Sequence, residues 1–148
     1  MTGSDNIEPT WLAETERPLV LVVDDDDGIR EGLSELLEDA GFATVGARHG
    51  LEALTLLGTM TAPPSFILLD LMMPVMDGWA FCDSRKKSPA LTEIPVIAIS
   101  ASDISDWNRP AGIDALISKP IDVDKFAWLA LRMAGRKDGQ KRPRPLLH

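Results

Sequence analysis

The chain has 148 residues, the length of one ordinary domain. Hydrophobic residues make up 45% and charged residues 26%, which excludes a disordered or low-complexity protein. The single cysteine, Cys82, excludes an intramolecular disulfide framework, and no apolar run is long enough to cross a bilayer. The first residues carry acids rather than an apolar stretch, so we expect no secretory signal, no membrane contact and a cytoplasmic location.

The formal net charge of −8 is unevenly distributed along the chain. Residues 1–17 carry four acids and one base, whereas residues 132–148 carry six bases and one acid. The segment between them is therefore strongly acidic. Because phosphate contacts dominate nucleic-acid affinity, this charge predicts no direct binding of nucleic acid and favours a divalent cation as ligand.

Five short apolar runs predict five strands. In chain order they are Leu19–Val23, Ala43–Gly46, Phe66–Leu69, Ile94–Ile99 and Ala115–Ser118. The first run, LVLVV, is apolar at every position, which is typical of parallel strands buried on both faces.

Amphipathic segments separate these strands. Between Ile29 and Ala40 the apolar residues recur at helical spacing, and Gly41 is the expected end of that helix. Further helices are predicted over 51–57, Gly78–Lys87 and Val123–Met133, the last with Asp122 as its N-cap. Ser102–Gly112 contains Pro110 and little helical pattern, so any helix there should be short or irregular. Alternating strands and helices predict an α/β fold with a doubly wound parallel sheet.

Composition divides the chain into three parts. Residues 1–17 lack clear periodicity and are predicted to form an N-terminal arm. Residues 18–133 contain all the predicted strands and helices and form the expected domain. Residues 134–148 are rich in Arg, Lys, Gly and Pro, which predicts a basic, flexible C-terminal tail.

Charged and polar side chains follow four of the predicted strands. Asp24–Asp27 follow the first strand, Asp70 the third, Ser100 the fourth and Lys119 the fifth. The carboxyl ends of parallel strands share one edge of the sheet, so we expect these groups to converge there. Two carboxylates 4 Å apart repel by about 4 kcal/mol at an effective dielectric constant near 20. The cluster therefore predicts a divalent cation, and its oxygen ligands suit Mg²⁺.

A metal beside a carboxylate, a hydroxyl and an ammonium group is suited to phosphoryl transfer. Asp70 is the expected nucleophile because the third strand should be central in the sheet. Lys119 would hold a phosphoryl oxygen as a point charge, and Ser100 would donate a hydrogen bond to another.

Four motifs together carry a family resemblance. They are VVDDDDGIR (Val22–Arg30), ILLDLMMPVMDG (Ile67–Gly78), PVIAISA (Pro95–Ala101) and SKP (Ser118–Pro120). Over residues 18–133 the chain resembles the receiver domain of bacterial two-component response regulators. The resemblance implies a flavodoxin-like (βα)5 fold with a five-stranded parallel sheet in the order 2-1-3-4-5.

The same resemblance assigns roles to individual residues. Asp70 matches the phosphoacceptor, Ser100 the switch hydroxyl and Lys119 the family's lysine. The resemblance places Mg²⁺ on four residues, Asp24, Asp25, Asp70 and Met72, the last through its backbone carbonyl.

Receiver domains imply a function and partners. A sensor histidine kinase or a histidine phosphotransfer protein would supply the phosphoryl group to Asp70. Phosphorylation would shift a two-state equilibrium that a downstream protein reads by contact, and slow autodephosphorylation would reset it. The chain would thus be a signalling domain rather than an enzyme acting on a separate substrate.

Two other functions remain open at this point. The run from Asp25 to Gly28 imitates the DxDG signature of haloacid dehalogenase-type phosphatases, in which Asp25 would be the nucleophile and Asp27 the acid/base. A receiver-like interaction module that is never phosphorylated is the third possibility. A simpler interpretation of the acidic run is a turn that caps the first helix.

Overall fold

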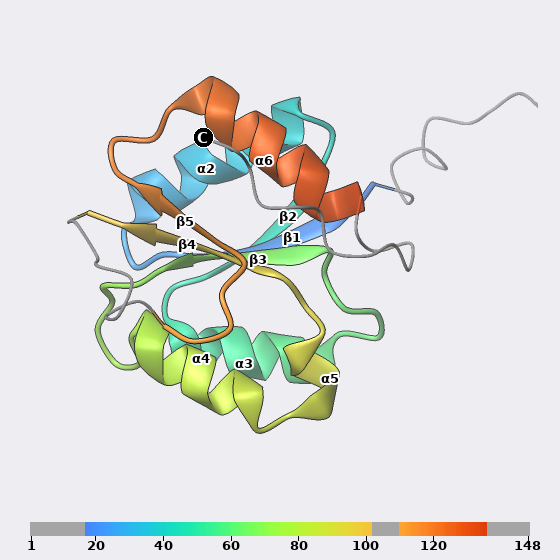
Figure 1. The fold of residues 1–148 in the computed structure, drawn as a ribbon, viewed down its shortest axis with the longest axis vertical. Helices are drawn as coiled ribbons and strands as arrows, with labels where there is room; N and C mark the ends of the chain where they lie inside the picture. The colour runs from blue at the N-terminus through green and yellow to red at the C-terminus, as the bar shows by residue number, and fades with distance from the viewer. Residues whose placement is uncertain (1–16, 102–109, 136–148) are drawn as a thin grey trace, which may run out of the picture.

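The computed structural model describes residues 17–101 and 110–135. Within these residues, five parallel strands form one sheet in the order β2-β1-β3-β4-β5 (Figure 1). The strands are β1 (Leu19–Val23), β2 (Ala43–Ala47), β3 (Phe66–Asp70), β4 (Val96–Ser100) and β5 (Ala115–Ser118). The helices are α2 (Asp27–Asp39), α3 (Gly50–Thr59), α4 (Gly78–Lys86), α5 (Pro89–Thr92) and α6 (Val123–Gly135). The predicted α/β class, flavodoxin-like topology and strand order are confirmed.

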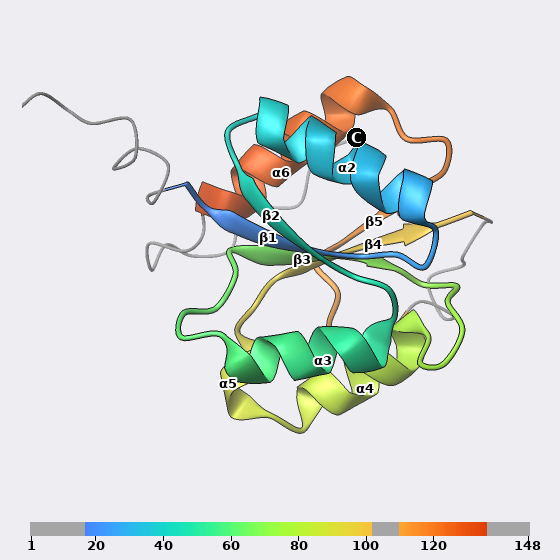
Figure 2. The ribbon, with the colours of Figure 1, turned by 180° about the vertical axis from the view of Figure 1, so that it is seen from behind.

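Helices cover both faces of the sheet, as Figures 1 and 2 show from opposite sides. Helices α2 and α6 lie on one face, and α3, α4 and α5 lie on the other. Alternate strand residues enter the two cores, so that Leu21 packs toward α3 and Val22 toward α2. The strand β3 is buried at all five positions because it is central and has helices on either side. Burial on both faces explains why the strands are apolar at nearly every position.

The predicted element boundaries differ from the observed ones by one or two residues. Strand β3 includes Asp70, and β4 begins only at Val96 because Pro95 has no N–H to donate to a neighbouring strand. Helix α6 continues past Met133 to Gly135, since Ala134 still packs against the core. The first two residues of the predicted tail are therefore helical.

One helix was not predicted. Helix α5 has four residues, too few for any periodicity to mark it, and two backbone N–H groups, those of Leu91 and Thr92, donate to the Ser88 carbonyl. The predicted irregular helix after β4 falls largely on residues 102–109, which lie outside the described residues. So do residues 1–16 of the arm and 136–148 of the tail.

Polar side chains start the longer helices. Asp122 accepts a hydrogen bond from the Lys125 amide at 3.1 Å, which confirms it as the N-cap of α6. Asp77 caps α4 in the same way through the Ala80 amide at 2.9 Å. The N-cap of α3 is His49, whose Nδ1 accepts from the Glu52 amide at 3.2 Å.

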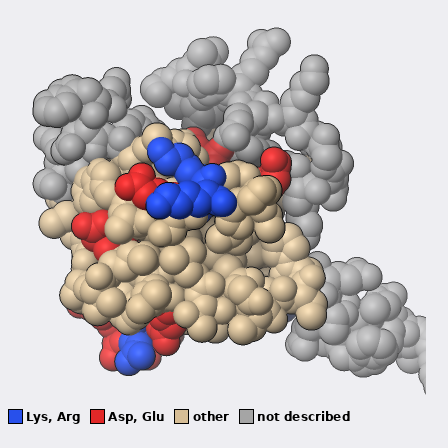
Figure 3. All heavy atoms as spheres, turned by 90° about the horizontal axis from the view of Figure 1, so that it is seen from below, with Lys and Arg blue, Asp and Glu red and all other residues tan. Residues whose placement is uncertain are grey.

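Charge is distributed differently over the two helical layers. Figure 3, seen from below, shows a face on which most atoms belong to uncharged residues. The sequence explains this, because residues 53–69 contain no charged side chain. Helix α2, in contrast, has five exposed acids: Asp27, Glu31, Glu35, Glu38 and Asp39. No helix among the described residues is long and apolar enough to span a bilayer.

Candidate functional site

The carboxyl ends of the central strands form the candidate site. Strand register pairs Asp70 with Ile99 and Ser100 with Ser118, so these strands end side by side. The backbone N–H of Lys119 donates to the Ser100 carbonyl at 2.9 Å, which places Lys119 next to the end of β4. The predicted site residues from β3, β4 and β5 therefore do meet at one edge of the sheet.

Three carboxylates converge at this edge. One oxygen each of Asp24, Asp25 and Asp70 lies within 4.8 Å of the other two. Asp24 and Asp70 are buried, at 1% and 4% exposure, whereas Asp25 is exposed. Asp24 Oδ1 accepts a hydrogen bond from the Asp26 amide at 2.9 Å, and Asp70 Oδ1 accepts one from the Met72 amide at 3.2 Å.

The electrostatics of the two buried acids favour their neutral forms. Burial is the main cause that raises the pKa of Asp24, and the charges of Asp70 and Asp25 raise it further. Burial likewise raises the pKa of Asp70, with Asp25 adding to the effect. Hydrogen bonds from the Asp26 and Met72 amides, together with the Lys119 ammonium, act in the opposite direction.

The cluster has the donor set of a divalent-cation site. Asp24 Oδ2 is buried and receives no hydrogen bond from any residue that the structure describes. An unsatisfied buried carboxylate oxygen is costly, and a coordinated cation would satisfy it. Three carboxylates around one point fit Mg²⁺, which binds through a few carboxylates and keeps several waters.

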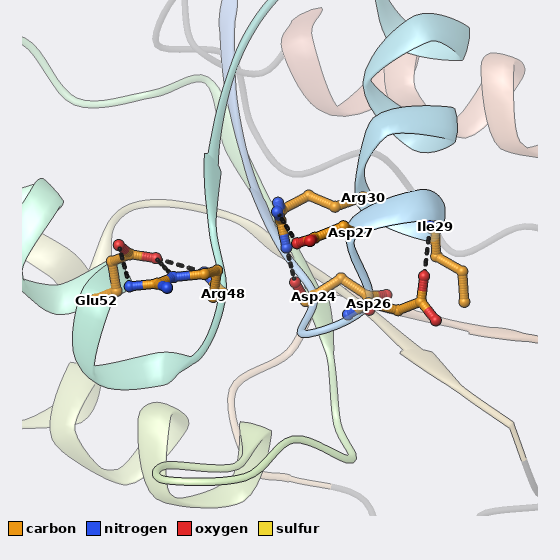
Figure 4. Close-up of polar contacts among 7 residues, drawn as sticks. All are labelled: Asp24, Asp26, Asp27, Ile29, Arg30, Arg48 and Glu52. Atoms are coloured by element: carbon orange, nitrogen blue, oxygen red, sulfur yellow. Dashed lines mark hydrogen bonds and ion pairs between the residues drawn. The ribbon is translucent and has the colours of Figure 1, made fainter.

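The other two acids of the run lie outside this cluster. Asp26 is the N-cap of α2, since its Oδ1 accepts a hydrogen bond from the Ile29 amide at 2.9 Å (Figure 4). Asp27 pairs with Arg30. The simpler interpretation of the run, a helix cap, thus holds for Asp26. The phosphatase alternative loses support, because its acid/base, Asp27, does not join Asp25 at the cluster.

Sequence reasoning missed one contact at this edge. Arg30 donates to the Asp24 carbonyl at 2.8 Å and also to the Asp27 carboxylate (Figure 4). An arginine three residues after an acid on a helix suggests an ordinary surface pair, so only the fold reveals the contact with Asp24. The Lys119–Pro120 peptide bond at the same edge is cis, which agrees with what the resemblance to receiver domains implies.

In the turn between β3 and α4, the backbone of Gly78 lies close to the backbone of Asp70 and Leu71. Met72, two residues after Asp70, is 61% exposed, and its backbone amide contacts Asp70 Oδ1. Val75 has a φ of 68°, and the Met76 amide donates to the Pro74 carbonyl at 2.7 Å across it, which forms a γ-turn. The turn ends where Gly78 lies against the backbone that carries Asp70.

Replacing Gly78 with alanine should destabilise this turn. A Cβ at that position would lie 2.6 Å from Leu71 Cδ2 and 2.8 Å from Leu71 Cα, so backbone beside Asp70 must shift. We expect a loss of about 1–3 kcal/mol in unfolding free energy, measured by urea denaturation. Gly58→Ala is the control, because a Cβ there meets nothing within 4 Å and alanine favours the helix. Equal stability of the two variants would contradict the expectation.

The geometry agrees with a comparison to known families. The sequence profile described as the response regulator receiver domain matches residues 20–129, most of the chain. The chain belongs to the response regulator receiver family. It is therefore a phosphorylation-dependent signalling domain of the two-component type.

Individual relatives are identical to this chain at about a third of the aligned residues. The polar-differentiation response regulator DivK of Brucella anthropi is 34% identical over 110 residues, 72% of this chain and 88% of that protein. The hybrid signal transduction protein dokA of Dictyostelium discoideum is 36% identical over 109 residues, 72% of this chain but 6% of that protein. The chain also spans about half the length of two relatives from Synechocystis sp., the DNA-binding dual master transcriptional regulator RpaA and the response regulator Rre1.

A solved structure supports the same assignment. The receiver domain of the Francisella response regulator 1452 is 32% identical, with a TM-score of 0.71. The match covers 82% of this chain and 99% of that domain. This match supports the receiver fold for the part of the chain that it covers.

Proposed function

We propose that this receiver domain accepts a phosphoryl group on Asp70 with the help of Mg²⁺. The observation that carries the proposal is the cluster of Asp24, Asp25 and Asp70, whose oxygens lie within 4.8 Å of one another at the end of the central strands. Asp70 is the acid that belongs to the central strand β3, and Met72 and Pro74 in the turn after it are exposed.

The metal ligands in this proposal are four residues: Asp24, Asp25, Asp70 and the backbone carbonyl of Met72. The buried, unsatisfied oxygen of Asp24 supports a cation here. When bound, a divalent cation supplies positive charge opposite the phosphoryl oxygens. It also removes the mutual repulsion that otherwise raises the pKa of Asp24.

The chemical step is a transfer between two nucleophiles. A carboxylate oxygen of Asp70 attacks the phosphorus of a phosphohistidine, an O–P bond forms and the P–N bond breaks. The electron pair of the broken bond stays on the imidazole nitrogen of the donor. Lys119, whose charge acts on both Asp24 and Asp70, would hold a phosphoryl oxygen, and Ser100 would donate to another.

The donor and the reader of the signal are proteins in this proposal. A sensor histidine kinase or a histidine phosphotransfer protein supplies the phosphoryl group, and hydrolysis of the acyl phosphate returns Asp70 to its starting state. A downstream protein, still unidentified, binds the phosphorylated form preferentially and so shifts the equilibrium. In this proposal the domain contacts neither nucleic acid nor membrane directly, and its location is cytoplasmic.

The proposal is tested by intact-mass measurement after incubation with acetyl phosphate and Mg²⁺. We expect a gain of one phosphoryl group that requires Mg²⁺ and that Asp70→Asn abolishes. Asp77→Asn is the matched control, because Asp77 caps α4 at the same edge, is exposed, and asparagine caps helices equally well. Asp77→Asn should be phosphorylated as the unaltered protein is.

Two outcomes would overturn the proposal. Phosphorylation of Asp25, located by peptide mapping, would support the phosphatase chemistry instead. No adduct with acetyl phosphate, together with no binding of beryllofluoride, would leave a receiver fold that acts only as an interaction module.

A further inference from the structure

Arg30 contacts three elements beside the acidic cluster: the loop after β1, helix α2 and strand β2. Its Nη1 donates to the Asp24 carbonyl at 2.8 Å, and its Nη2 donates to the Asp27 carboxylate on α2 (Figure 4). Its aliphatic part lies over Gly46 of β2, where a Cβ would be 3.1 Å from Arg30 Cδ. The side chain is only 17% exposed, so it is packed rather than a freely moving surface charge.

The carbonyl that Arg30 binds belongs to the peptide unit joining Asp24 to Asp25. The same stretch is held at two further points. The Asp24 amide donates to the Ala47 carbonyl at 3.0 Å, and Asp24 Oδ1 accepts from the Asp26 amide at 2.9 Å. A planar peptide unit fixed at its carbonyl also fixes the direction in which the next residue leaves the chain. The Arg30 contact thus holds the backbone from which Asp25 continues.

Asp25 is the acid of the cluster that most needs such support. Asp24 and Asp70 are enclosed by the sheet and its helices, whereas Asp25 is exposed. Repulsion among the three carboxylates favours rotation of the exposed one into solvent. Holding its backbone reduces the cost of returning it when a cation binds, which is the role of outer partners at many metal sites.

We propose that Arg30 is a positioning residue that orients Asp25 for divalent-cation binding, and that Gly46 provides the space that Arg30 occupies. The inference rests on the metal site of the proposed function. It adds two residues, one on α2 and one on the edge strand β2, that touch neither the cation nor the phosphoryl group.

A purely electrostatic role for Arg30 predicts the opposite result. If Arg30 acted only as a positive charge beside the acids, Arg30→Met would strengthen Mg²⁺ binding, and Arg30→Lys would leave it unchanged. Positioning uses two nitrogens of a planar group, one for the Asp24 carbonyl and one for Asp27, whereas lysine has a single nitrogen on a flexible stem. Under the proposal both substitutions weaken Mg²⁺ binding.

The test is a Mg²⁺ titration of the full chain followed by the amide NMR signals of residues 24–27 and 70–72. We expect the dissociation constant to rise about tenfold or more in Arg30→Met and in Arg30→Lys. Arg48→Met is the matched control: Arg48 directly follows β2, its side chain is 65% exposed, and its ion pair is with Glu52 (Figure 4). Its removal deletes the same charge without touching the acidic loop.

Gly46→Val separates positioning from general destabilisation. Valine suits an exposed edge strand better than glycine, so the thermal midpoint should stay at or above that of the unaltered protein. Its side chain nevertheless displaces Arg30, and Mg²⁺ binding should weaken as in Arg30→Met. If the unaltered protein binds Mg²⁺ and the Arg30 variants bind it equally well, this inference is wrong while the proposed function stands. If the unaltered protein binds no Mg²⁺, both are wrong.

Discussion

Replacing Arg85 with methionine should lower the unfolding free energy by about 3 kcal/mol or more. Arg85 is 4% exposed at the end of α4, and its guanidinium donates to three backbone carbonyls. The Nη2 hydrogen bonds reach Thr92 at 3.0 Å and Ile94 at 2.6 Å, and Nη1 reaches Gly112 at 3.4 Å. Methionine fills a similar space but donates nothing, so these carbonyls would lose a charged donor where water has little access.

Urea denaturation of the described variant measures this loss directly. Lys86→Met is the matched control, because it removes the same charge from the same helix end at a side chain that is 51% exposed. The control should change stability by less than about 0.5 kcal/mol. If the two variants have the same midpoint, the three carbonyl contacts contribute nothing to stability.

The contacts of Arg85 also matter for the site. They join α5 and the start of β4 to the turn at Gly112, which leads into β5. Asp114 strengthens the same junction, since its Oδ2 accepts from the Val96 amide at 2.9 Å. Strand β5 in turn places Lys119 beside the end of β4. Arg85 therefore supports the position of Lys119 from the opposite, amino-terminal end of strands β4 and β5.

The sheet and the acidic cluster were predictable because they depend on simple patterns. Continuous apolar runs mark buried parallel strands, and three runs end directly at Asp24, Asp70 and Ser100. Once the sheet is parallel, the strand ends must share an edge, whatever the details of packing. The convergence of Asp24, Asp25 and Asp70 follows from topology alone.

The supporting contacts were not predictable in the same way. Arg85 lies in an amphipathic segment where a charged residue indicates a solvent-facing position, yet the fold buries it against carbonyls from two other segments. His49 acts as a helix cap, although histidine is not among the usual capping residues. Arg30 reaches Asp24 across a turn whose shape no periodic pattern describes. The Arg85 and Arg30 contacts depend on three-dimensional distances that sequence spacing does not contain, whereas the His49 cap is local but uses an unusual residue type.

Asp24→Asn should make the domain more stable at pH 7 without divalent cations, by about 1 kcal/mol or more. Burial raises the pKa of Asp24 above its usual 3.8, so the folded state binds a proton more readily than the unfolded state. The stability of the unaltered protein therefore falls as pH rises from about 4 through the raised pKa. Asparagine has no charge to desolvate, so the variant lacks this decrease, and its advantage should grow with pH to a plateau.

Mg²⁺ should make the unaltered protein more stable than Asp24→Asn, which is the reverse of their order without Mg²⁺. A ligand that binds only the folded state stabilises it by about 2.7 kcal/mol at one hundred times its dissociation constant. The unaltered protein gains this stabilisation, whereas Asp24→Asn loses a carboxylate ligand and gains less. Thermal or urea unfolding with and without Mg²⁺ across pH 4–8 measures both effects. Asp77→Asn is the control, and its stability should match that of the unaltered protein under every condition. A variant less stable than the unaltered protein at pH 7 without Mg²⁺ would show that the buried carboxylate is compensated within the protein, and no cation would then be needed to explain Asp24.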